Sequence, residues 1–119
     1  METKRYDLED RLVRFACMCL DVCELLPGTK AGHNLEYQLA KSGTAPALLY
    51  GEAQAAESRA DFIHKMKIAL KELRESRINL RIIKEKPLIA DEKINMAFKE
   101  VNELIAIFTS SIETTKKNL

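Results

Sequence analysis

Three cysteines lie within seven residues near the start of the chain, and cysteine thiolates can bind zinc or act as nucleophiles. On a helix, Cys19 and Cys23 share one face because they are four residues apart, whereas Cys17 points about 200° away from Cys19. Thiols in this arrangement cannot surround one ion, and neither His33 nor His64 has the spacing of a metal motif. We therefore predict no metal site and interpret the cysteines as small core and surface residues.

No other set of residues predicts catalysis. The sequence contains no nucleophile elbow, no phosphate-binding glycine loop and no zinc-protease helix motif. Its densest polar group, Glu52, Gln54, Glu57 and Ser58, is typical of a helix end followed by an N-cap. His64 falls outside the apolar pattern of its segment and is expected at the surface. We therefore predict no enzymatic activity, no cofactor and no small-molecule substrate.

The most informative feature is a cationic segment between Glu57 and Lys86, which holds nine basic and five acidic residues in a chain of net charge +1. At about 100° per residue, five of the cations and three apolar residues fall within one arc of about 120° on a helix. Apolar side chains among long cations are typical of a contact surface. The candidate contact residues are Lys67, Lys71, Arg74, Arg77 and Arg81, together with Ile63, Leu70 and Ile78.

Three interpretations of this face remain open: a contact with another copy of the chain, a contact with the phosphates of nucleic acid, or an ordinary solvated helix face. Self-assembly agrees with the nearly neutral total charge, since acidic residues elsewhere could meet the cations. Nucleic-acid binding would depend on salt, and the face lacks aromatic side chains for stacking on single-stranded RNA. The acidic candidates are Asp10, Asp21 and Glu24 in the first helix and Glu92, Glu100 and Glu103 in the last.

The elements that carry these residues are helices, because apolar residues recur at spacings of three and four along four segments. Pro27 and Pro87 end the first and third segments, and Ser58 followed by Asp61 has the form of a capping box. Pro46 lies within the second segment, where it should kink the helix. The predicted helices cover about 7–26, 33–55, 58–86 and 91–113, and the polar tail 114–119 is expected to fray.

Four such stripes predict one all-α domain over 1–119, an antiparallel up-down-up-down four-helix bundle with a proline-kinked second helix. With 46% hydrophobic and 31% charged residues, the composition excludes disordered, collagen-like and membrane classes. The first ten residues are charged and polar, unlike a signal peptide, and the odd number of close cysteines favours a reducing compartment. We therefore expect a cytoplasmic protein that does not bind membranes.

The runs GTAPALLYGEAQ at 43–54, AESRADFIHKM at 56–66 and LKELRES at 70–76 carry a family resemblance that covers about half of the chain. They resemble bacterial four-helix bundle proteins related to those encoded in 23S rRNA intervening sequences, a group that includes accessory proteins of diversity-generating retroelements. The resemblance implies a homopentamer and no known enzymatic activity. Leu48 stands where the family often has a polar residue, and the net charge of +1 departs from the basic character of the accessory proteins.

Together these observations predict a non-catalytic, self-assembling bundle that acts as a structural or interaction module. The alternative is an accessory protein that binds RNA or DNA through the basic face of the third helix.

Overall fold

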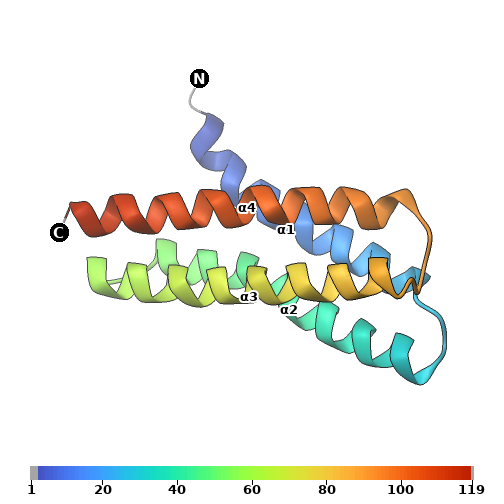
Figure 1. Ribbon diagram of the computed structural model, residues 1–119. Helices are drawn as coiled ribbons and strands as arrows, with labels where there is room; N and C mark the ends of the chain where they lie inside the picture. Colours follow the sequence, from blue (N-terminus) through green and yellow to red (C-terminus); the bar gives the residue numbers. More distant parts are fainter. Residues whose placement is uncertain (1–2, 119) are drawn as a thin grey trace.

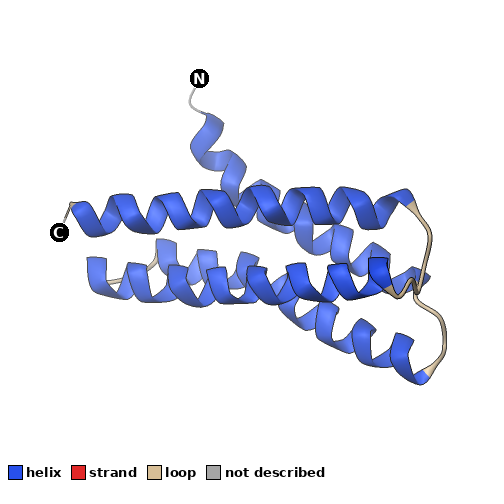
Figure 2. Cartoon of the chain, viewed as in Figure 1, coloured by secondary structure: helices blue, strands red, loops and turns tan. Residues whose placement is uncertain are grey.

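The computed structural model describes residues 3–118, and in this range the chain forms four helices and no strand (Figures 1 and 2). Each helix packs against two others in a cycle, α1 on α2, α2 on α3, α3 on α4 and α4 on α1. The backbones of the diagonally opposite helices, α1 with α3 and α2 with α4, do not come close to each other within the described range. The Cα positions extend over 47 × 29 × 20 Å. The helices are α1 (Thr3–Leu25), α2 (Lys30–Gln54), α3 (Arg59–Glu85) and α4 (Glu92–Lys117).

Side-chain caps define where three of the helices begin. The Thr29 hydroxyl accepts the Gly32 N–H at 3.0 Å, and the Ser58 hydroxyl accepts the Asp61 N–H at 3.0 Å. Asp91 caps α4 through its carboxylate, which accepts the Lys93 N–H at 2.8 Å. Each bond satisfies a backbone donor that the first turn leaves without an intrahelical partner. The serine half of the capping box predicted at Ser58 is therefore confirmed.

Three helices are longer than the sequence pattern predicts. α1 begins at Thr3 rather than at residue 7. α2 begins at Lys30 rather than at residue 33, because Thr29 supplies a cap before the apolar spacing resumes. α4 continues to Lys117, so the expectation of a frayed tail from residue 114 was wrong for 114–117; Leu119 lies outside the described residues. The final turns are held by a bond from the Thr115 hydroxyl to the Ser111 carbonyl and by one from the Arg59 guanidinium to the Asn118 carbonyl.

The core consists of one apolar stripe from each helix, and most of the predicted stripe residues are buried. At several of the exceptions, the residue next to the predicted one is buried instead. Tyr50 is buried in place of the partly exposed Leu49, and its ring meets Phe108 edge-on at 6.2 Å between centroids. In α4, Ala97 and Leu104 are buried in place of Phe98 and Ile105, which flank the stripe. The largest fully buried side chains include Leu12, Phe15, Leu39, Met66, Leu73, Leu80, Ile83, Val101, Leu104 and Phe108.

Small and polar residues mark the places where α2 packs most closely on its neighbours. A Cβ added at Gly43 would lie 2.6 Å from the Cys19 sulfur, so the glycine allows α1 and α2 to approach each other. Next to Gly43, where α2 faces α3, the buried Ser42 hydroxyl accepts bonds from Ser76 at 3.0 Å and from the Asn79 amide at 3.1 Å. These directional bonds fix how α2 lies along α3, because sliding either helix would leave buried polar groups unpaired.

Candidate contact groove

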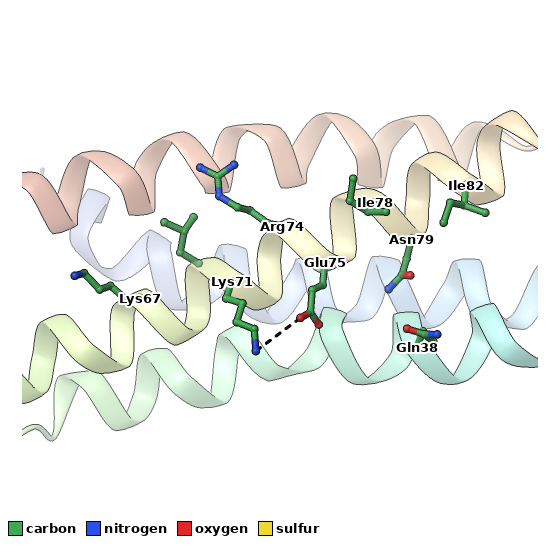
Figure 3. Close-up of a pocket in the computed structure, with 9 residues that line it drawn as sticks. Gln38, Lys67, Lys71, Arg74, Glu75, Ile78, Asn79 and Ile82 are labelled. Atoms are coloured by element: carbon green, nitrogen blue, oxygen red, sulfur yellow. Dashed lines mark ion pairs between the residues drawn. The ribbon is translucent and has the colours of Figure 1, made fainter.

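A groove of about 790 Å³ runs along the outer face of α3, on the side away from the core (Figure 3). We call it the α3 groove. All of its lining residues come from α3 except Gln38, which comes from α2. The lining residues on α3 are Lys67, Leu70, Lys71, Arg74, Glu75, Ile78, Asn79 and Ile82.

The α3 groove is cationic towards the start of α3 and apolar towards its end. Lys67, Lys71 and Arg74 occupy successive turns of the first part and are exposed. Ile78 and Ile82 follow one turn apart, and each leaves 47% of its surface exposed to water. An apolar pair of this kind on a rigid helix, beside long cations, is typical of a surface that contacts another macromolecule.

Two interactions involve residues that line the groove. The Lys71 ammonium lies 3.9 Å from the Glu75 carboxylate one turn along the helix, and Figure 3 draws this pair. Both partners are exposed, so the pair adds little stability. Asn79 lines the groove but is only 8% exposed, because its amide donates to Ser42 in the interior. One side of the groove is thus anchored to the packing of α2 on α3.

The α3 groove brings together five of the eight residues that the sequence singles out: Lys67, Leu70, Lys71, Arg74 and Ile78. Arg77 instead turns towards α4, where its Nε donates to the Asn102 side chain at 2.8 Å and its guanidinium lies 5.5 Å from the Phe98 ring centroid. Arg81 donates to the Glu85 carboxylate at 2.6 Å within α3.

Ile63, the eighth of these residues, belongs to the core and is 8% exposed, which corrects its assignment to the contact face. The final turns of α4 run beside the start of α3, where Arg59 donates to the Asn118 carbonyl, and Ile63 lies one turn further along α3.

Sequence reasoning missed Gln38, Glu75, Asn79 and Ile82. Gln38 comes from a different helix, so only the packing of α2 on α3 places it in the groove. Ile82 lies one turn beyond Ile78. The pair of isoleucines four residues apart, outside the core stripe, was the signal that could have identified it.

The acidic residues proposed to meet the cations divide into two groups. Arg11 on α1 binds Glu100 with two bonds of 2.9 Å and Glu103 with one of 2.8 Å, so both carboxylates already have a cationic partner within the chain. The bond to Glu100 raises the pKa of the Arg11 guanidinium, which stays charged. The other four candidates are exposed and are not bound by Arg11: Asp10, Asp21, Glu24 and Glu92.

Glu72 carries a buried carboxylate oxygen beside the α2–α3 contact. Its Oε1 has no hydrogen-bond partner. Burial raises the pKa of this carboxyl above its ordinary value, and the neighbouring Glu75 raises it further. The ionised form is therefore disfavoured at this position.

The cysteines do not form a reactive cluster. Cys17 is exposed, whereas Cys19 and Cys23 are buried, and the Cys23 thiol donates to the Glu36 carbonyl at 3.4 Å. Burial raises the pKa of Cys23 to about 11 and also raises that of Cys19. Among the residues whose positions are described, no three His, Cys, Asp or Glu side chains come close enough to hold a metal ion, and no helix is long and apolar enough to cross a membrane.

The four packed helices and the groove on α3 define a small all-α protein in which no catalytic constellation is evident. The sequence profile described as 23S rRNA-intervening sequence protein matches residues 5–110. Because this match spans most of the chain, the protein belongs to that family.

The chain is also similar to a crystal structure from Bacteroides thetaiotaomicron VPI-5482, described as a protein with unknown function from the S23 ribosomal protein family. The identity is 29% over 87% of this chain and 96% of that chain, with a TM-score of 0.80. No curated protein is a significant match.

Proposed function

We propose that this protein is a non-catalytic module that self-assembles, with the α3 groove as one of its contact surfaces. The observation that carries the proposal is the exposed pair Ile78 and Ile82 on the rigid outer face of α3. Because each side chain is about half exposed, covering it contributes about 1 kcal/mol. Leu70 extends the apolar surface along the groove. Long cations beside these residues would shield the contact and select its partner.

The charges of α3 favour this function over nucleic-acid binding. Arg77 and Lys84 lie against the Phe98 ring, and Arg81 is paired with Glu85, so these cations are already engaged within the subunit. Lys67, Lys71 and Arg74 remain in the groove, and a carboxylate lies 3.9 Å from the second of them. So few cations would neutralise few phosphates and give weak, salt-sensitive binding.

For the architecture we propose an antiparallel up-down-up-down arrangement with a bend in α2. The cyclic packing and the short connections between consecutive helices support the arrangement. Pro46 has no N–H to donate to the Ser42 carbonyl, which supports a bend at this turn. The divergence of the first half of α2 from α3 in Figure 1 agrees with that bend.

The assembly that we propose is the pentamer implied by the family resemblance, and the compartment is the cytoplasm. Three closely spaced cysteines, two of them buried as small apolar side chains, are suited to a reducing environment.

Sedimentation velocity across a range of micromolar concentrations tests self-assembly. We expect a discrete oligomer for the wild type and dissociation for Ile78→Glu, which places a charge in the proposed contact. Lys99→Glu is the matched control, because Lys99 is exposed on α4 outside the groove. A wild type that sediments as a monomer at all concentrations would refute self-assembly. A shift of labelled structured RNA at low salt that disappears as salt rises would favour the nucleic-acid alternative.

A further inference from the structure

We propose that the α3 groove of one copy receives a second, acidic groove on the next copy, so that subunits join head to tail. This inference rests on the proposed self-assembly and identifies the surface that fills the α3 groove.

The second groove lies between α1 and α4 and has a volume of about 320 Å³. We call it the α1–α4 groove. Its apolar part consists of Met18 and Met96, the latter 53% exposed. Methionine side chains are flexible and adapt to the shape of a partner. The charged residues of its lining are Asp21, Asp91, Glu92 and Lys93.

The two grooves are opposite in charge and alike in apolar character. The α3 groove holds three cations and one carboxylate, whereas the α1–α4 groove holds three carboxylates and one ammonium group. The apolar part of the first groove consists mainly of isoleucines, and that of the second consists of methionines. Docking the two would therefore pair unlike charges around an apolar centre, which is the usual anatomy of a specific interface.

One subunit cannot satisfy both grooves by itself. The α3 groove is lined by α2 and α3, the other groove by α1 and α4, so the two share no helix. Pairing the α3 groove with its own copy would offer its three cations a single carboxylate, Glu75, whether the cationic ends meet each other or meet the isoleucines. The contact must then be heterologous: each subunit offers one groove to each neighbour, and the chain of subunits closes into a ring when the rotation permits.

Asp21 is the most available anion in the α1–α4 groove. Asp91 is used in capping α4, and Glu92 accepts a bond from Asn95 at 3.3 Å. Asp21 is exposed in the middle of α1 and makes no ion pair within the described range. A reversal of charge at Asp21 therefore alters the groove and leaves the start of α4 intact.

The test uses two variants, each defective in one groove: Lys71→Glu/Arg74→Glu and Asp21→Lys/Met96→Lys. Each alone should raise the dissociation constant by about 100-fold, since like charges across an interface cost several kcal/mol. Mixed in equal amounts, they should associate again, because the mixture contains complementary pairs of grooves. The controls are Lys99→Glu and Asp10→Lys, which reverse charges outside the grooves, and circular dichroism establishes that each variant is folded.

The outcomes separate this inference from the proposal on which it rests. If the wild type is monomeric, self-assembly itself is refuted. If the wild type assembles and only the α3 variant dissociates, self-assembly stands and the head-to-tail contact is refuted.

Carbodiimide cross-linking of the wild type gives a second measurement that needs no variant. Mass spectrometry should find links from Lys67 or Lys71 to Asp21 or Glu92 in the cross-linked dimer and not in the monomer. A dimer band without these links would overturn the head-to-tail contact.

Discussion

Gly43→Ala tests the closest approach of α1 and α2. The added Cβ would lie 2.6 Å from the sulfur and 2.7 Å from the Cβ of Cys19. The Cys19 Cβ is fixed to its backbone and cannot rotate away, so the two helices must separate. Overpacking of this kind costs about 1–3 kcal/mol, and two simultaneous contacts place this case near the upper end. Alanine gains about 1 kcal/mol over glycine within a helix, so we expect a net loss of about 2 kcal/mol in the free energy of unfolding.

Gly51→Ala is the matched control in the same helix. A Cβ at Gly51 would meet no atom within 4 Å, so this variant should gain about 0.5–1 kcal/mol from helix propensity. Urea and thermal unfolding, followed by circular dichroism at one protein concentration, should then separate the two variants by about 3 kcal/mol, or roughly 10 °C. Equal stabilisation of both variants would refute the close contact between α1 and α2.

Two further predictions concern titratable groups. A thiol reagent should modify Cys17 rapidly, and Cys19 and Cys23 only after unfolding, since burial raises the pKa of both buried thiols; mass spectrometry showing three rapid additions to the folded protein would contradict this. Glu72→Gln should increase stability at pH 7, because burial raises the pKa of the Glu72 carboxyl in the folded state. Wild-type stability then falls as pH rises through the raised pKa, so the advantage of the variant should vanish below the ordinary value of 4.5. Urea unfolding from pH 4 to pH 8 measures this difference, and parallel profiles would exclude it.

The helices could be predicted because their signals are local. Apolar residues at helical spacing identify the buried stripes, and a serine three residues before an aspartate identifies the start of α3. The end of α4 could not be predicted from residues 114–117, which are polar and lack an apolar repeat. That segment is helical through contacts that the spacing does not encode, such as the bond from Arg59 to the Asn118 carbonyl.

The contact face was predictable only in part, for the same reason. Helical angles place Lys71, Arg74 and Ile78 together, and these residues do line the groove. The angles cannot show that Arg77 turns towards Phe98 on α4, or that Arg11 pairs with two of the expected acidic partners. Such pairings join helices distant in sequence, and they decide which charges remain available to a partner.

Helix α3 contributes side chains to both the core and the α3 groove, and Asn79 lies at the boundary between the two. Its amide donates to Ser42 inside, whereas its side chain also lines the α3 groove. A shift of α2 along α3 would break this bond and deform the groove, because Gln38 moves with α2. The buried polar residues thus stabilise one alignment of the two helices and, through it, one shape of the surface. A wholly apolar contact between α2 and α3 would hold the helices together without fixing that shape.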